Sequence, residues 1–225
     1  MRYIPKDSGI GRQVTFIPTG MYDIIRKKRR ETDMAKIKWN AGTLLSPLPA
    51  ALISSGTLEK PNVMTAAWVG IINSEPPRAY VSIRPERFSH GIIKDSMEFV
   101  INVTTEKLSF AADYCGVKSG RDEDKFKSCS LTPLKSFAVN SPSVAESPVS
   151  LECRVFDIIT LGSHDMFLAD IVSVSVEDSL IDADNRLRLE DAGVISYTHG
   201  EYFSSGEYLG HFGWSVKKDG NAGKR

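Results

Sequence analysis

The sequence predicts a mainly β protein, a closed or partly closed β-barrel with helical trim and Greek-key-like connections. Apolar runs of strand length, separated by Gly, Pro and Asn, dominate the chain from Leu44 onward. Two long apolar runs, at 151–159 and 166–176, flank a short Gly-containing turn, and few helical segments stand between the strands. The span from about 40 to 215 suits one domain of this kind.

In the first half of the chain, the predicted strands are 50–55, 63–72, 78–83 and 98–103. The run 63–72 is apolar for most of its length, which is typical of a strand that is buried on both faces. Pro76 and Pro77 force an extended break after it. In the next strand, alternation places Ala79, Val81 and Ile83 on one face, and a short helix is expected over 88–95.

In the second half, Thr105 is a suitable N-cap for a helix that runs to about Tyr114 and that Cys115-Gly116 would end. The stretch 119–128 is expected to be a loop that enters a short helix. The turn at 162–165 joins the two long strands into a hairpin. The last forty residues are rich in Gly and Tyr, which predicts loops with one or two short strands.

The overall charge of the chain selects no partner. It has 28 Lys and Arg against 28 Asp and Glu, so no global field favours nucleic acid. Residues 1–33 hold 8 of the basic and 4 of the acidic residues, which leaves 20 against 24 for 34–225. We expect 1–33 to be a poorly ordered basic extension, 34–218 to be the folded domain and 219–225 to be a tail. The basic run 26–30 is also of a kind that binds nucleic acid or anionic lipid, but nothing around it supports that function.

The sequence indicates a cytoplasmic protein. It has no run of about 18 uncharged apolar residues, so we expect no membrane-spanning helix, and its first residues lack the apolar core of a secretory signal. The three cysteines are Cys115, Cys129 and Cys153, an odd number without C-x-x-C spacing. A disulfide framework is therefore not expected, and a reducing compartment fits better.

A cluster of phosphate donors lies between the third predicted strand and the helix after it. Arg84, Arg87, Ser89 and His90 supply two guanidinium groups, a hydroxyl and an imidazole. Ser89 sits where the helix would begin, and free amides at a helix N-terminus favour an anion. The alternative interpretation is a surface loop with solvated arginines and a serine cap.

Small residues just before this cluster predict a site for a planar ring. Asn62, Thr65, Ala66 and Ala67 would let a ring lie close to the strand backbone, whose amides can stabilise developing negative charge. A ring site next to a phosphate site suits flavin mononucleotide (FMN). Trp68 either walls that ring or fills the core, and the core is favoured. Asn62 is also a residue that shapes turns.

Histidine patterns predict no metal site, because His90, His164, His199 and His211 are scattered along the sequence. His164 lies at the predicted hairpin tip, where an imidazole can face a barrel mouth. The alternative is a plain turn, since Gly, Ser and Asp are what turns use.

Several segments, in order, resemble the flavin reductase-like, FMN-binding split β-barrel proteins, and specifically their flavoredoxin branch. The matching segments are NVMTAAWVG at 62–70, VSIRPERFSHGII at 81–93, EFVIN at 98–102, ADYCGVKSGRDEDKF at 112–126, SLECRV at 150–155, GSHDMFLADI at 162–171 and YFSSGEYLGHFGWS at 202–215. The resemblance covers about Met34 to Lys218.

The resemblance implies a homodimer of split barrels with FMN near the subunit interface and a possible redox protein partner. It implies that the cofactor-binding residues are Asn62, Thr65, Ala66, Ala67, Trp68, Ser82, Ile83, Arg84, Ser89, His90 and Lys125. Ser89 stands where the family often has Thr, and both supply a hydroxyl. His164 falls in the turn that flavin reductases use near nicotinamide and flavin, which implies a catalytic role.

Two features of the resemblance leave alternatives open. Asp165 follows His164 and Ser163 precedes it, unlike the Gly-Asp-His form of the best-known reductases, and this puts direct use of NAD(P)H in question. Cys115 is either a reactive thiol or a buried structural cysteine, and the latter is favoured. Lys125 or Arg121 would reach the flavin across the dimer.

Three functions fit the sequence. The leading hypothesis is a flavin-dependent oxidoreductase that moves a hydride from NADH or NADPH to FMN. The second is an FMN electron carrier of the flavoredoxin type without significant nicotinamide turnover. The third is a ligand-binding or sensor barrel without redox cycling.

Overall fold

The computed structural model describes residues 36–216, so the predictions for the head 1–33 and the tail 219–225 lie outside the described residues. The chain divides into two units between Thr43 and Leu44. In the first unit, the described residues 36–43 are exposed coil. The described helices and strands all lie in the second unit.

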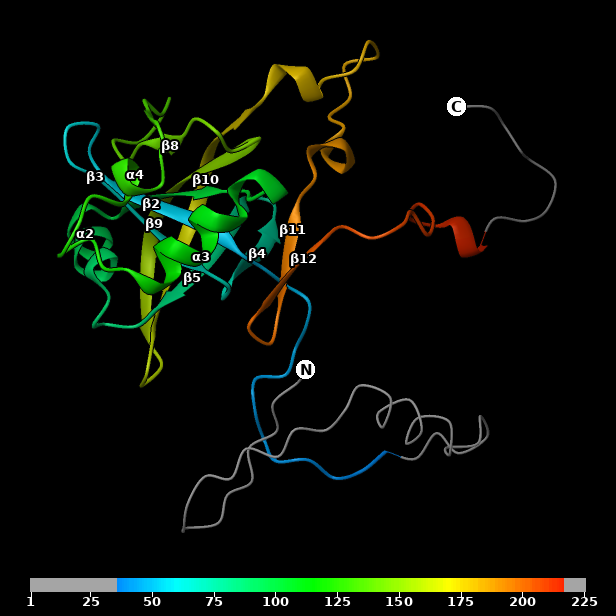
Figure 1. Cartoon of the computed structure of the whole chain (residues 1–225), viewed down its shortest axis with the longest axis horizontal. Coiled ribbons are helices and arrows are strands. Elements are labelled where there is room, and N and C mark those ends of the chain that lie inside the picture. Colours follow the sequence, from blue (N-terminus) through cyan, green and yellow to red (C-terminus); the bar gives the residue numbers. More distant parts are fainter. Residues whose placement is uncertain (1–35, 217–225) are drawn as a thin grey trace. The chain divides into compact units, whose positions relative to one another are not determined.

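Seven strands form one sheet in the order β3-β2-β6-β9-β10-β5-β4, and every neighbouring pair is antiparallel (Figure 1). Their bounds are β2 Ala51–Gly56, β3 Pro61–Ala66, β4 Val69–Ser74, β5 Pro77–Ile83, β6 Glu98–Asn102, β9 Val149–Thr160 and β10 Asp165–Val176. The long hairpin of β9 and β10, which the sequence predicted, lies at the centre of the order.

The connection between β3 and β4 forces this sheet to curl. The two strands stand at opposite ends of the strand order, yet only Ala67 and Trp68 separate them in the chain. The three peptide links from Ala66 to Val69 span roughly 10 Å at most, so the two edges must meet. The amide of Ser82 in β5 donates to the carbonyl of Trp68 at 2.8 Å, which fixes the bend. The predicted mainly β barrel with helical trim is confirmed.

Shorter elements surround the barrel. Two small sheets accompany the large one. In the first, β11 Ile195–Thr198 pairs with both β1 Leu48–Pro49 and β12 Glu201–Ser204. In the second, β7 Pro133–Leu134 pairs with β8 Ser143–Val144. The helices are α2 Phe88–Ser96, η1 Glu106–Leu108, α3 Ser109–Val117, α4 Lys125–Ser128, η2 Asp178–Leu180, η3 Leu189–Ala192 and η4 Trp214–Val216. Over residues 36–216, no helix has the length and apolar character that crossing a membrane requires. Short strands near the C-terminus were predicted and are present.

Two apolar cores position the helices. The first fills the barrel and includes Ala79, Val81 and Ile83, which share one face as predicted. The second lies between the barrel and the helices, where Val63 of β3 packs with Cys115 of α3 and with other buried side chains that include Phe126 of α4. Strand β3 therefore contributes to both cores, and the second core holds α3 and α4 against its outer face.

Two predicted boundaries are wrong. The run 63–72 is two strands rather than one, because the chain bends at Ala67 and Trp68 to pass from one sheet edge to the other. Helix α3 does not end at Cys115-Gly116 but continues to Val117. A Cβ built on Gly116 would lie 3.5 Å from Cβ of Thr65, an ordinary van der Waals contact, so Gly116 packs α3 on β3 and does not end the helix.

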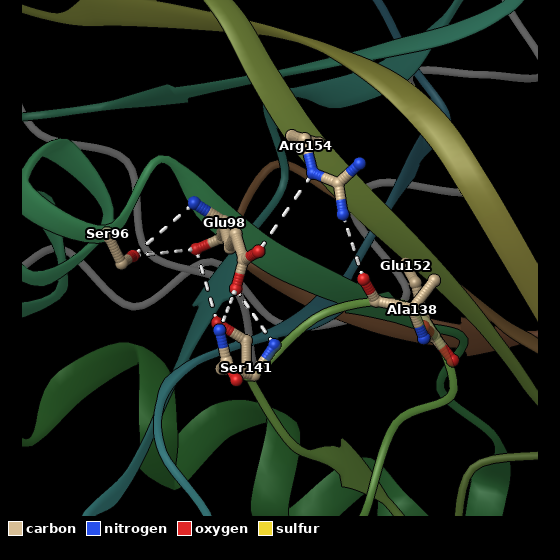
Figure 2. A network of polar contacts seen from close by, with 7 residues as sticks. Ser96, Glu98, Ala138, Ser141, Glu152 and Arg154 are labelled. Carbon is tan, nitrogen blue, oxygen red and sulfur yellow. Dashed lines mark hydrogen bonds and ion pairs between the residues drawn. The ribbon is translucent and has the colours of Figure 1, made fainter.

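A polar network fastens the loop 133–144 to the sheet (Figure 2). The fully buried Glu152 accepts hydrogen bonds from the amides of Phe137 at 2.9 Å and Ala138 at 2.6 Å. Nη2 of Arg154 donates to the carbonyl of Ala138 at 2.9 Å, and Glu98 accepts from the amide of Asn140 at 2.8 Å. Two backbone N–H donors compensate the negative charge of the buried Glu152 carboxylate, as a buried charge requires. This network therefore has a structural role.

Candidate functional site

A cavity of about 390 Å³ opens where the end of β5, the start of α2 and the loop between α3 and α4 come together. Its basic lining residues are Arg84, Arg87, Lys118, Arg121 and Lys125. Its acidic lining residues are Glu86 and Asp122. Five cations against two anions make the cavity electropositive. Its volume falls in the range of roughly 300–1,000 Å³ that ligand sites occupy.

The start of α2 supplies donors for an anion. Arg87 stands at the N-cap in an extended conformation, with no side chain capping the helix. The first-turn amides and the helix dipole therefore favour negative charge near Ser89. Ser89 is buried, and its Oγ accepts a hydrogen bond from Nδ2 of Asn62 at 2.7 Å. Three of the four donors that the sequence predicted for a phosphate, Arg84, Arg87 and Ser89, thus line this cavity, whereas His90 does not.

Asn62 ties this helix to the barrel. Its Nδ2 also donates to Oγ of Ser55 at 3.0 Å, so one amide links β3, β2 and α2. Gly120 lies directly over it. A Cβ built at Gly120 would collide with Oδ1 of Asn62 and lie 2.8 Å from Cδ1 of Phe88. A glycine is therefore needed for the loop between α3 and α4 to close over Asn62.

Lys125 also fixes the loop between α3 and α4. Its buried Nζ donates to the carbonyls of Cys115 at 3.2 Å and Lys118 at 3.1 Å. Burial lowers the pKa of this ammonium, which the positive charge of Arg87 lowers further. On the outside, Glu123 accepts from the hydroxyl of Tyr114 at 2.6 Å. The loop is thus fixed at both ends of its turn.

The hairpin tip carries His164, just before β10, and Asp165, the first residue of β10, and their side chains contact different partners. The ring of His164 packs on Trp68 with centroids 4.4 Å apart. The next side chain, that of Asp165, accepts a hydrogen bond from Nε2 of His90 at 2.8 Å. Burial lowers the pKa of His164, and the charge of Arg84 lowers it further, so the neutral imidazole is favoured at pH 7. A neutral imidazole beside an arginine can donate or accept one proton.

A second cavity of about 700 Å³ adjoins the first. Asn62, Thr57 and Ile92 are among its lining residues. The residues that line both cavities are Phe88, Gly120, Arg121, Asp122 and Lys125. The loop between α3 and α4 therefore contributes to the lining of both cavities.

The structure brings four of the predicted site residues to these cavities, namely Asn62, Arg84, Ser89 and Lys125. The other eight lie outside both linings: Thr65, Ala66, Ala67, Trp68, Ser82, Ile83, His90 and His164. The hydroxyl of Thr65 donates to the carbonyl of Ala112, while Ala66 and Ile83 belong to the barrel core. These eight gather around the β3–β4 bend and the adjoining end of β5 and tip of β10. Their roles toward a cofactor stay predictions.

The sequence did not indicate that most of the loop between α3 and α4 lines the candidate site. Lys118, Ser119, Gly120 and Asp122 line the first cavity but were not predicted as site residues. The loop was expected, yet nothing local indicates which surface it covers. The one available signal was Gly120 between polar residues, since such a glycine marks close approach of backbone to another group.

The donor chemistry fits a flavin nucleotide. Arg84, Arg87 and Ser89 supply the charge and hydroxyl that a phosphate needs. Gly120 packs so closely on Asn62 of β3 that a Cβ there would collide with it, and the described side chains place no ring at this point. The fit therefore rests on the donor set and the cavity volume.

Comparisons with known proteins agree with this chemistry. Residues 44–204 match the flavin reductase like domain. An uncharacterized protein of Archaeoglobus fulgidus is 40% identical over 138 residues, which cover 61% of this chain and 77% of that protein. Flavoredoxin of Desulfovibrio vulgaris (Miyazaki F) is 31% identical with a TM-score of 0.75, over 81% of this chain and 100% of that one.

A third comparison concerns the fold alone. The FMN-binding protein of Thermus thermophilus superposes with a TM-score of 0.66 at 23% identity, over 81% of this chain and 99% of that one. The fold is thus the predicted split barrel. Since the family match spans well over half of the sequence, the chain belongs to the flavin reductase like domain family.

Proposed function

We propose that this chain binds FMN with its phosphate in the 390 Å³ cavity and works as an NAD(P)H-dependent flavin reductase. The observation that carries the proposal is the convergence of Arg84, Arg87 and buried Ser89 on one electropositive cavity at the start of α2. When bound, FMN supplies the hydride-accepting chemistry. The protein supplies binding, orientation and electrostatics.

Each group has a defined task in this proposal. Arg84 and Arg87 neutralise the phosphate, and the first-turn amides of α2 orient it. Asn62 positions Ser89 through the 2.7 Å hydrogen bond. The ring of His164 packs on Trp68 and offers a surface on which a nicotinamide can stack. Its neutral form, which the lowered pKa favours, carries one exchangeable N–H proton. No general acid–base pair is required for hydride transfer.

The test is a spectroscopic titration without oxygen. Purified protein is loaded with FMN, unbound FMN is removed, and NADH or NADPH is added while the flavin absorbance is followed. Bleaching at a rate that saturates with nicotinamide supports the reductase. Failure to retain FMN contradicts the assignment of the site itself.

A flavoredoxin-type electron carrier is the second candidate. It is favoured by the 31% identity to flavoredoxin over the full length of that protein. This function requires FMN, the same phosphate contacts and a redox protein partner, but no nicotinamide turnover. In the titration above, flavin that stays oxidised with both nucleotides and is reduced by dithionite would favour the carrier.

The same proposal includes a homodimer with FMN near the subunit interface. Support comes from exposed apolar side chains on three strands of the large sheet, β4, β9 and β10, among them Ile71, Phe156 and Val174. Exposed apolar surface is typical of an interface when it is contiguous. Light scattering tests it, since a monomeric mass at micromolar concentration contradicts the dimer. The cytoplasmic location expected from the cysteine count also belongs to the proposal.

A further inference from the structure

Two of the three cysteines touch each other. Sγ of Cys115 lies 3.8 Å from Sγ of Cys129, although the two residues come from different helical segments. Cys115 is in α3, and Cys129 follows the last residue of α4. Cys153 is a contrast within the same chain: it is fully buried on β9, and its Sγ donates to the carbonyl of Leu151 at 3.5 Å.

We propose that Cys115 and Cys129 form a thiol–disulfide exchange site, which low-molecular-weight disulfides oxidise to an internal disulfide and thiols reduce again. This inference goes beyond the proposed function and does not rest on it. The site is built from a sulfur pair in contact, a difference in access between the two sulfurs, and a cation beside them.

Closing the bond needs only a small movement. A disulfide has an S–S distance of about 2.05 Å, so the sulfurs must approach by roughly 1.8 Å. Cys115 is 1% exposed and is packed in the second core, so its position is fixed. Cys129 lies at the end of a four-residue helix, where only one turn of hydrogen bonds resists a shift. Cys129 is therefore the residue that moves.

The difference in access sets the order of reaction. Cys129 is half-buried and is open to a reagent, whereas Cys115 is covered. The Cys129 thiolate attacks a small disulfide RSSR, which forms a mixed disulfide and releases one thiolate RS⁻. The Cys115 thiolate then attacks the Cys129 sulfur and releases the second RS⁻. Both protons lost by the cysteines go to solvent and are taken up by the leaving thiolates, giving two RSH and one protein disulfide.

The surroundings favour the same order. Burial raises the pKa of Cys129, but a hydrogen bond from the Cys115 thiol and the charge of Lys125 lower it. Burial raises the pKa of Cys115 to about 12. The charged groups that act on the pair are Lys125, which favours the thiolates, and Glu123, which opposes them. Cys129 is thus the better first nucleophile, and exchange accelerates as the pH rises.

Disulfide formation would also constrain residues that line the cavities. The disulfide closes a ring of 15 residues that contains the whole loop between α3 and α4. Within that ring, Lys118, Gly120 and Arg121 line the first cavity, as does Cys115 itself. Oxidation therefore ties together the two ends of the loop that lines both cavities.

The test uses the full chain and hydroxyethyl disulfide, a small uncharged probe. After incubation at pH 8, acid quenching and alkylation, intact mass and peptide mapping locate every thiol. We expect a loss of two hydrogen atoms, a Cys115–Cys129 cross-linked peptide, a free Cys153 and full reversal by dithiothreitol. A wild-type protein that stays reduced, or that stops at a mixed disulfide, would overturn the proposal.

Single variants test the order. Cys115→Ser should accumulate the mixed disulfide on Cys129, whereas Cys129→Ser should remain unmodified because Cys115 is covered. Cys153→Ser is the matched control and should cross-link as the wild type does. A stable adduct on Cys115 in the Cys129→Ser variant would contradict the assigned order, provided that circular dichroism shows a folded protein. The wild-type mapping needs no variant and stands if one of them fails to fold.

Discussion

Nε2 of His90 lies 2.8 Å from Oδ2 of Asp165, which joins the first turn of α2 to the first residue of β10. The carboxylate can only accept, so the imidazole N–H donates. The ring of His90 also meets Phe167 edge-on, with centroids 5.2 Å apart. This hydrogen bond therefore holds the start of α2, which carries the predicted phosphate donors, against the hairpin tip, which carries His164.

The first prediction concerns acid stability. The hydrogen bond from His90 lowers the pKa of Asp165. A lowered carboxyl pKa contributes stability above the unfolded value of about 3.9, and that stability is lost as the pH falls through the folded value. Asp165→Asn should therefore cost about 1–2 kcal/mol of unfolding free energy at pH 7, and this deficit should shrink below pH ~4.

Urea denaturation at pH 7 and at pH ~3.5 measures this difference. Asp170→Asn is the matched control on the same strand, since Asp170 pairs with Arg78 at a partly exposed position. It should cost less than about 0.5 kcal/mol. An equal deficit for both variants at pH 7 would refute the special role of Asp165.

The second prediction concerns the phosphate. Arg84→Ala and Arg87→Ala should each raise the Kd for FMN about 10- to 100-fold, because each removes a charge-assisted hydrogen bond of roughly 1.5–3 kcal/mol. The effect on the rate of flavin reduction in fully loaded protein should be smaller. Fluorescence titration gives the Kd. Arg186→Ala, at an exposed position remote in sequence from the site, should bind FMN normally.

The third prediction concerns the close approach at Gly120. Gly120→Ala introduces a Cβ that collides with Asn62 and Phe88, so the loop must move away from β3. We expect a lower melting temperature and weaker FMN binding. Gly91→Ala is the matched control, since a Cβ there meets nothing within 4 Å and a helix gains about 0.5–1 kcal/mol from the change. If both variants melt alike, the packing at Gly120 is not tight.

The fourth prediction concerns the coupling between Arg84 and His164. Because the charge of Arg84 lowers the pKa of His164, Arg84→Ala should shift the His164 midpoint upward in an NMR titration. Arg87→Ala should leave that midpoint in place, as Arg87 is not among the groups that act on His164. A shift of equal size in both variants would point to a general loss of positive charge rather than to a specific interaction of Arg84 with His164.

The sequence predicted the barrel, because strand alternation and turn residues are local signals. It failed at Ala67 and Trp68, since only the sheet order shows that the run 63–72 must cross between edges. It also failed at Gly116, which packs α3 on Thr65. Both errors have one cause: a partner that is distant in sequence decides the local conformation.

The candidate site shows the same limit. Arg84 and Ser89 reach one cavity because a helix end collects donors that are close in sequence. Lys125 of α4 lines the same cavity, although it lies in a distant part of the chain. The ring of His90 is instead engaged by Asp165, 75 residues away, and no local pattern indicates that pairing. Its predicted contact with a phosphate remains a prediction.

The residues that the two cavities share have a thermodynamic consequence. Five residues line both cavities, so a molecule that displaces any of them on binding in one cavity also changes the shape of the other. The affinity of each cavity would then depend on whether the other is filled. Linkage requires each occupant to change the affinity of the other by the same factor.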